Sequence, residues 1–129
     1  MATGTKNART VVSSTSRSGG SAATRGTLSL QTALGGILTM KITNGATGPT
    51  LQCEGRVLIA HNASTPSAGA AGTDWKTVFR FGGGTVNSAV TEQSWEIPAA
   101  VMALEVEFEG NTAQSVTVEA FVSELTSVG

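Results

Sequence analysis

Hydrophobic and polar residues alternate along most of the chain after residue 26. In residues 38–43, for example, the sequence LTMKIT alternates without interruption. A period of two is typical of β-strands, because successive side chains of a strand point to opposite faces of the sheet. The 3.6-residue period of an amphipathic α-helix does not persist over a window of about 11 residues anywhere in the chain. The pattern therefore predicts an all-β protein.

Turn residues divide the alternating region into short segments. Asn44-Gly45, Gly48-Pro49 and Gly110-Asn111 are turn dipeptides. We expect the strands at residues 27–34, 37–43, 51–60, 74–81, 94–97, 101–109 and 115–125. About seven or eight short strands without a crossover helix predict an antiparallel β-sandwich of the jelly-roll or Greek-key type.

For two of these strands, the pattern indicates which side chains face the core. In residues 51–60 one parity is apolar, and its members are Leu51, Cys53, Val57 and Ile59. Gly55 interrupts this strand, which indicates a bulge or a close approach of another segment. In residues 74–81 we expect one face to pack in the core, and it comprises Trp75, Thr77, Phe79 and Phe81.

Residues 101–109 show the clearest alternation. Four apolar side chains face inward by parity, namely Met102, Leu104, Val106 and Phe108. The other parity places Glu105, Glu107 and Glu109 about 6.8 Å apart on one outer face. Paired carboxylates at such spacings occur in glycosidases, but a solvated strand face offers no cleft for a sugar. We therefore expect a polar outer face, with a salt-bridging surface for a basic partner as the alternative.

Residues 1–26 differ from the rest of the chain. Apart from the initiator Met, Val11 and Val12 are their only medium or large apolar residues, and they contain four bases and no acid. Such a segment buries too little apolar area to offset the entropy of ordering its backbone. We expect a flexible basic arm over residues 1–26 and a β-sandwich domain over residues 27–129. The arm is either a loose terminus or a segment that orders on a partner.

The composition narrows the function classes. About half of the residues are Thr, Ser, Ala or Gly, and only 13% are charged, with a net charge of −1. Helical bundles and coiled coils need more Leu, Glu, Lys and Arg. A net charge near zero does not favour nucleic-acid or membrane binding. Without an apolar run of about 18 residues or a signal-peptide core, we expect a soluble chain that is not exported by that route.

The residues that perform catalysis or bind metals are scarce. The chain has one His, one Cys and no Tyr. His61 begins a long Ala-, Ser- and Gly-rich loop over residues 61–73, and Cys53 lies on the apolar parity of its strand, where a free Cys acts as a small hydrophobe. Gly82-Gly83-Gly84 lacks the ending of a phosphate-binding loop and precedes no helix. We expect no enzymatic activity, no metal and no cofactor.

The charges are ordered along the chain. Residues 1–41 contain five bases and no acid, whereas residues 91–129 contain seven acids and no base. A basic arm and an acidic surface are complementary, so the arm could reach neighbouring copies or an acidic partner. We expect its bases to make these contacts, namely Lys6, Arg9, Arg17 and Arg25. The alternative is that the arm folds back on its own domain.

Three segments resemble small structural proteins of tailed-bacteriophage virions, in particular jelly-roll cement or decoration proteins. They are TALGGILTMKITNGATGP at residues 32–49, DWKTVFRFGGG at residues 74–84 and VMALEVEFEGNTAQSVTVEAF at residues 101–121. The resemblance implies a non-enzymatic protein that forms dimers or trimers on the outer capsid surface of the virion. It also implies synthesis in the host cytoplasm and the major capsid protein of the same phage as partner, without direct contact with nucleic acid or membrane.

A second hypothesis is a carbohydrate- or partner-binding sandwich module, for example in a phage tail. Such a module needs a row of exposed aromatic residues or an acidic calcium-binding loop. Trp75 and Trp95 are the two Trp residues available for it. The sequence therefore favours the cement protein over the module.

Overall fold

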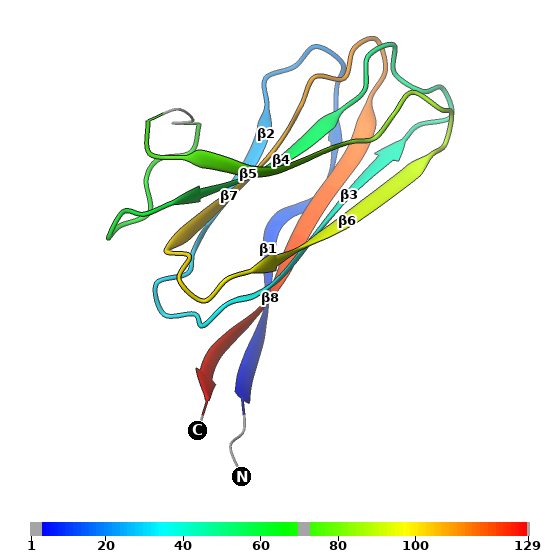
Figure 1. The fold of residues 1–129 in the computed structure, drawn as a ribbon. Helices are drawn as coiled ribbons and strands as arrows, with labels where there is room; N and C mark the ends of the chain where they lie inside the picture. Colours follow the sequence, from blue (N-terminus) through cyan, green and yellow to red (C-terminus); the bar gives the residue numbers. More distant parts are fainter. Residues whose placement is uncertain (1–3, 70–72, 129) are drawn as a thin grey trace.

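The computed structural model describes residues 4–69 and 73–128, and it contains eight β-strands in two four-stranded sheets (Figure 1). The strands are β1 (Gly4–Arg17), β2 (Thr24–Ser29), β3 (Gly36–Asn44), β4 (Glu54–Ala60), β5 (Lys76–Gly82), β6 (Val90–Ile97), β7 (Ala103–Glu109) and β8 (Val116–Val128). All pairings within the two sheets are antiparallel. The predicted all-β sandwich is confirmed. No helix in the described part of the chain is long and apolar enough to cross a membrane.

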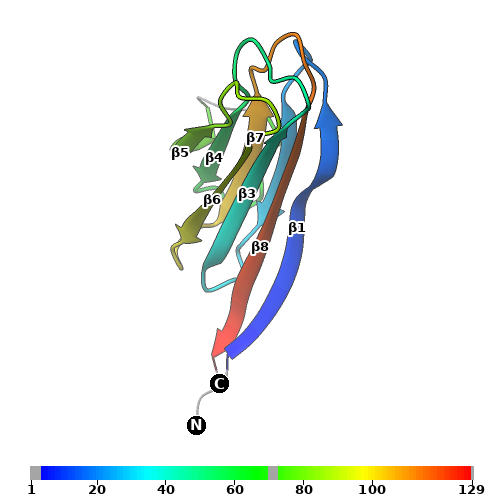
Figure 2. The ribbon, with the colours of Figure 1, turned by 90° about the vertical axis from the view of Figure 1, so that its right-hand side faces the viewer.

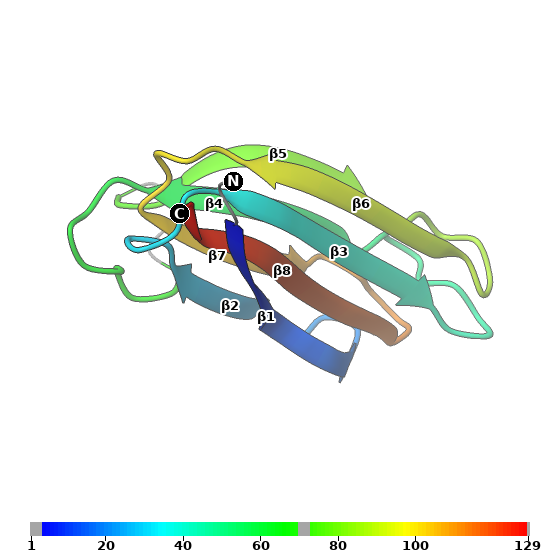
Figure 3. The same cartoon turned by 90° about the horizontal axis from the view of Figure 1, so that it is seen from below.

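The strand order identifies the sandwich as a jelly roll. One sheet has the order β1-β8-β3-β6 and the other β2-β7-β4-β5. The first strand thus pairs with the last, the second with the seventh, the third with the sixth and the fourth with the fifth. This is the arrangement of a long hairpin rolled into two packed sheets. Figure 3 shows the two layers from one end.

The core lies between the sheets and consists of the side chains that the alternation places inward. On β3 and β8 these are Leu38, Met40, Ile42, Val118, Ala120 and Val122. On β4 and β7 they include Cys53, which precedes β4, and Val57, Leu104, Val106 and Phe108. The predicted inward parity of residues 101–109 is therefore confirmed at its central positions.

The flexible arm predicted for residues 1–26 is wrong for the described residues. Strand β1 pairs with β8 from Gly4 to Arg17, and Val12 is 6% exposed in the core. The boundary expected after residue 26 falls inside β2. An edge strand needs few apolar residues, because β8 satisfies its backbone hydrogen bonds and the Thr-rich sequence favours a strand. Figure 2 shows β1 and β8 as neighbours that extend together beyond the body of the sandwich toward the two termini.

The predicted single face of residues 74–81 is also wrong, because the register shifts within the strand. Phe79 pairs with Val57, but Thr77 pairs with Leu58, so that Val78 is an extra residue in β5. Such a bulge reverses the alternation. Phe79 therefore packs against the main core, whereas Trp75 packs on the opposite face of the sheet.

Two further expectations for residues 51–60 have different outcomes. Leu51 is 62% exposed and lies before β4, so its predicted place in the core is wrong. Gly55 marks a close approach, as expected: a Cβ atom there would lie 2.5 Å from Cε1 of Phe81.

Candidate functional site

The predicted contact bases of the first 26 residues mostly bind their own chain. Arg9 Nη1 lies 3.1 Å from Glu124 Oε1, and Arg25 Nε donates to Glu107 Oε2 at 3.0 Å. Both carboxylates belong to the acidic last third of the sequence. The basic first segment and the acidic last third of the chain therefore form ion pairs within one molecule. This agrees with the alternative that the segment folds back on its own domain.

The other two bases differ from each other. Arg17 is 2% exposed and donates to the Ser21 hydroxyl and to the main-chain oxygens of Ser21 and Ala22. Lys6 is exposed and lines an apolar groove of about 310 Å³ with Ile37 and Leu125. Of the four predicted contact residues, the buried Arg17 is the least suited to meet a protein partner, and Lys6 is available for one.

The predicted polar outer face of residues 101–109 is wrong for two of its three carboxylates. The side chains of Glu105 and Glu107 are fully buried, and Glu109 is partly exposed. Glu107 accepts hydrogen bonds from Arg25 at 3.0 Å and from Arg56 at 2.7 Å, and Arg56 also binds Glu109. These five side chains form an ionic cluster on the outer face of sheet β2-β7-β4-β5.

The described residues between β4 and β5 are 61–69 and 73–75, and we call them the covering loop; within it, residues 67–69 and Trp75 lie over part of this face. The Gly69 amide donates to Glu105 Oε1 at 2.9 Å, and Trp75 Nε1 donates to the Ser67 carbonyl at 2.9 Å. Trp75 is 1% exposed and packs with Leu58, Ala60 and Ala103 on the sheet. The loop and its Trp anchor thus remove from water a face that the alternation alone assigns to solvent.

Burial and charge shift two pKa values in the ionic cluster. Removal of Glu105 from water raises the pKa of its carboxyl, and the nearby charge of Glu107 adds to this effect, while the Gly69 amide and Arg25 oppose it. The hydrogen bond to Glu107 raises the pKa of Arg25. Glu107 is bound by two arginines and Glu105 Oε1 by the Gly69 amide, whereas the buried Glu105 Oε2 has no hydrogen-bond partner among the described residues. The contacts of Glu107 are those of a structural ion cluster.

The outer face of sheet β1-β8-β3-β6 has no such cover in the described part of the chain. Ile37 is 55% exposed, and Phe121 on the adjacent strand is 45% exposed. Phe121 lies opposite Thr39 in register, and the Thr39 and Ser94 hydroxyls are 2.9 Å apart. We call this surface the open face. It carries hydroxyl and apolar side chains and a Lys41–Glu119 pair at 3.7 Å.

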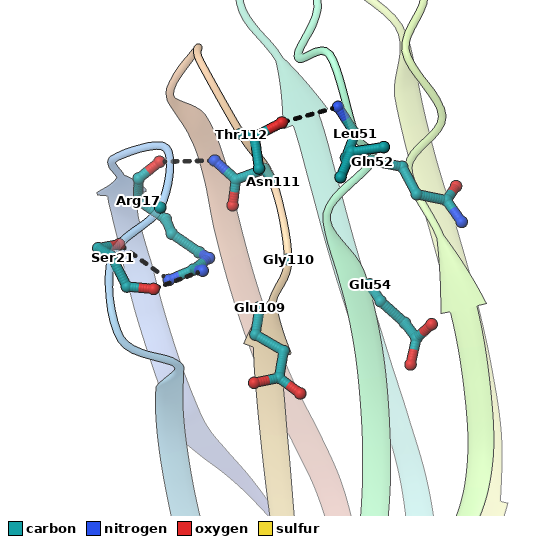
Figure 4. Close-up of a pocket in the computed structure, with 10 residues that line it drawn as sticks. Arg17, Ser21, Leu51, Gln52, Glu54, Glu109, Gly110, Asn111 and Thr112 are labelled. Atoms are coloured by element: carbon teal, nitrogen blue, oxygen red, sulfur yellow. Dashed lines mark hydrogen bonds between the residues drawn. The ribbon is translucent and has the colours of Figure 1, made fainter.

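A pocket of about 530 Å³, lined mostly by residues with polar side chains, lies at one end of the sandwich. Figure 4 shows its lining around the backbone of Gly110, with Arg17 and Ser21 on one side and Gln52 and Glu54 on the other. Gly110 has φ +99°, a conformation that favours glycine. The Leu51 amide donates to the Thr112 hydroxyl at 3.0 Å and joins the segment before β4 to the β7–β8 turn. We call this the end pocket. Sequence reasoning missed this pocket, because its residues come from the ends of β1, β4 and β7 and from the three connections beside them.

The structure places Cys53 in the core, His61 in an exposed loop and Gly83 in the turn after β5. Cys53 is fully buried, and burial raises the pKa of its thiol to about 11, so the reactive thiolate is scarce. His61 is exposed in the loop, as expected. Gly83 donates its amide to the Cys53 carbonyl in the turn after β5. The described residues contain no group of three or more His, Cys, Asp or Glu side chains that could hold a metal ion.

Comparisons with known proteins address the fold. No family model and no curated protein matches the sequence. Among solved structures, a carbohydrate-binding module from the family 9 glycoside hydrolase Cel9A of Ruminococcus flavefaciens is 10% identical, with a TM-score of 0.53 over 93% of this chain and 98% of that one. The K3 adhesin domain of Lys-gingipain from Porphyromonas gingivalis is 13% identical, with a TM-score of 0.49 over 79% of this chain.

This chain spans 62% of the length of that adhesin structure. The SPBc2 prophage-derived protein YomS is 18% identical, with a TM-score of 0.47 over 94% of this chain and 95% of that one. The similarity to the Ruminococcus flavefaciens module supports the β-sandwich fold.

Proposed function

We propose that this chain is a non-enzymatic structural protein that binds and stabilises a phage capsid shell as a cement or decoration protein. Its partner in this proposal is the major capsid protein of the same phage, and it acts as a homodimer or homotrimer on the outer surface of the virion. The observation that carries the proposal is the open face, on which Ile37 and Phe121 are exposed side by side along the diagonal of two paired strands.

The open face has the properties of a protein-binding surface. Interface cores are enriched in aromatic side chains and depleted of charged ones, and contiguous exposed apolar side chains mark interaction sites. The apolar groove beside Ile37 adds a recess at one end of this face. Lys6 lines the groove, so one of the predicted contact bases lies where the proposed partner would bind.

The chemistry of the described residues favours binding over catalysis. Catalysis requires a nucleophile or base beside a group that tunes it. The buried Cys53 thiol and the exposed His61 lie in different environments, and Glu105 and Glu107 are held by arginines and the Gly69 amide. A structural role needs none of these groups to react.

Binding to shells tests the proposal directly. Expanded shells of the same phage, prepared without this protein, are mixed with the purified chain and sedimented. We expect the double variant Ile37→Thr/Phe121→Thr to bind about tenfold more weakly, because exposed aromatic anchors dominate such interfaces. Val86→Thr is the matched control, since Val86 is 68% exposed but lies in the connection between β5 and β6.

Two results would contradict the proposal. One is binding of the double variant at wild-type strength, and the other is an equal loss in the Val86→Thr control. The second candidate function, a carbohydrate-binding module, is favoured by the chemistry of the end pocket.

A further inference from the structure

The end pocket contains buried polar atoms that have no partner among the described residues. Asn111 is fully buried, and its amide nitrogen donates to the carbonyls of Arg17 at 3.2 Å and Gln114 at 2.9 Å. These two bonds fix the orientation of the amide and leave Asn111 Oδ1 without a donor. In Figure 4 this oxygen points toward the space between the Arg17 side chain and Gly110.

Arg17 supplies an unused donor on the same side of the pocket. Its two terminal nitrogens bind Ser21 and Ala22, but its buried Nε has no acceptor. No carboxylate of residues 4–69 or 73–128 forms an ion pair with this guanidinium, although its side chain is almost fully buried. Unpaired buried polar groups are costly, so an unused donor beside an unused acceptor marks a place for a hydrogen-bonding ligand.

The opposite side of the pocket presents acceptors. Glu54 and Glu109 are direct partners in the register of β4 and β7, so both carboxylates project from the same face of the sheet. Arg80 lies 3.8 Å from Glu54, and Arg56 binds Glu109. Each carboxylate has two oxygens and about four lone-pair sites, so one arginine contact does not exhaust its capacity.

The mixed charges of the lining disfavour a simple ion. An anion would bind Arg17 but would be repelled by the two carboxylates, and a metal cation would be repelled by Arg17. A neutral ligand rich in hydroxyl groups avoids both conflicts, because each hydroxyl both donates and accepts. It can donate to Glu54, Glu109 and Asn111 Oδ1 and accept from Arg17 Nε.

We propose that the end pocket binds a neutral saccharide, of the size of a monosaccharide or disaccharide unit, through hydrogen bonds to Arg17, Glu54, Glu109 and Asn111. The volume of about 530 Å³ lies within the usual range for small-ligand pockets. The lining has no aromatic ring on which a sugar could stack, so we expect weak binding. This inference is independent of shell binding, which uses the open face.

Titrations of the ¹⁵N-labelled full chain test the proposal by NMR. The probes are glucose, galactose, maltose and cellobiose, with calcium chloride and sodium phosphate as ion probes. We expect at least one sugar to shift the amide signals of Gly110, Asn111 and Ser21, while the open-face signals of Thr39 and Phe121 stay in place. Neither ion should produce a saturating shift at the pocket.

Carboxylate variants separate a specific site from general weak binding. Glu54→Gln and Glu109→Gln should each weaken sugar binding about tenfold, because each replaces a charged acceptor by a neutral one. The matched control is Asp74→Asn, which makes the same chemical change in the loop near Asn62, outside the pocket. Unchanged amide spectra away from the substitution verify that each variant is folded.

Three results would overturn the inference. They are the absence of pocket shifts with every sugar, a saturating response to calcium or phosphate instead, and equal weakening in Asp74→Asn. Each of them leaves the shell-binding proposal intact, because that proposal is tested with variants of Ile37 and Phe121.

Discussion

The two sheets of the sandwich carry similar polar residues on their outer faces, but within residues 4–69 and 73–128 a connection lies over only one of these faces. On sheet β2-β7-β4-β5, the covering loop contacts Glu105, and the side chains of Glu105 and Glu107 are fully buried beside Arg25 and Arg56. On sheet β1-β8-β3-β6, Lys41 and Glu119 form a pair with side chains 35% and 29% exposed. The same residue types therefore serve as internal structure on one face and as a solvated surface on the other.

The difference arises from the length of one connection. The connection between β4 and β5 is long, and its described residues 67–69 and 75 lie over their own sheet, whereas no described segment lies over the open face. Exposed ion pairs contribute about 0–1 kcal/mol, but removal of one partner from a buried pair costs about 3–5 kcal/mol. Substitutions on the covered face should therefore lower the free energy of unfolding more than substitutions on the open face, whose exposed side chains can contact a partner.

The largest expected effect comes from removing the anchor of the covering loop. Trp75→Ala should lower the free energy of unfolding by about 4 kcal/mol, because a fully buried Trp is truncated. It should also make residues 61–69 more accessible to proteases, because the hydrogen bond from the indole N–H to the Ser67 carbonyl is lost. Urea denaturation and limited proteolysis measure the two effects.

The matched control for this change lies on the open face. Phe121→Ala removes an aromatic ring that is 45% exposed, and it should lower the free energy of unfolding by less than about 1 kcal/mol. Equal destabilisation by the two substitutions would show that the loop does not distinguish the faces.

The next largest effect concerns the ion pairs themselves. Glu107→Ala leaves the partly buried Arg25 and Arg56 without their shared carboxylate and should cost about 3 kcal/mol. Glu119→Ala breaks the partly exposed pair with Lys41 and should cost no more than about 1 kcal/mol. Denaturant unfolding of both variants measures the contrast, and a cost for Glu119→Ala as large as that for Glu107→Ala would contradict it.

Sequence alternation predicts the sandwich and much of the core, because inward apolar side chains repeat every second residue in β3, β7 and β8. It cannot predict the covering loop. The parity of Glu105 and Glu107 is correct, but parity assigns a side chain to a face and says nothing of what lies over that face. The bulge at Val78 cannot be predicted from the alternation either. One extra residue there reverses the alternation, and no Gly or Pro marks its position.

Strand β1 was missed for a different physical reason. Its hydrogen bonds come from β8, which lies more than a hundred residues away in sequence, for example where Arg9 pairs with Val122. The composition of Gly4–Arg17 does not show that such a distant strand pairs with it. The end pocket shares this property, since Arg17 at the end of β1, Glu54 at the start of β4 and Asn111 after β7 meet only in the folded sandwich.

The smallest expected effect is a pH dependence confined to the covered face. The pKa of Glu105 is raised by burial, so the folded state holds this proton at a pH where the unfolded chain, with an ordinary pKa of about 4.3, has lost it. As pH rises from the unfolded value through the folded one, this group therefore lowers the stability of the protein. Below both values both states are protonated, and the group contributes no pH dependence.

Glu105→Gln should remove this slope, because the amide resembles the protonated carboxyl and does not titrate. Its stability relative to the parent chain should rise as the pH increases from about 4.3 toward neutrality, by less than either effect above. Urea denaturation at several pH values measures the difference, with the exposed Glu92→Gln as control. A relative stability of Glu105→Gln that falls as the pH rises would mean that the ionised carboxylate is stabilised by Arg25 and the Gly69 amide more than burial penalises it. In that case the ionised Glu105 carboxylate would stabilise the folded state, as the carboxylate of a solvated ion pair does. The two outer faces would then differ in their packing and not in their pH response.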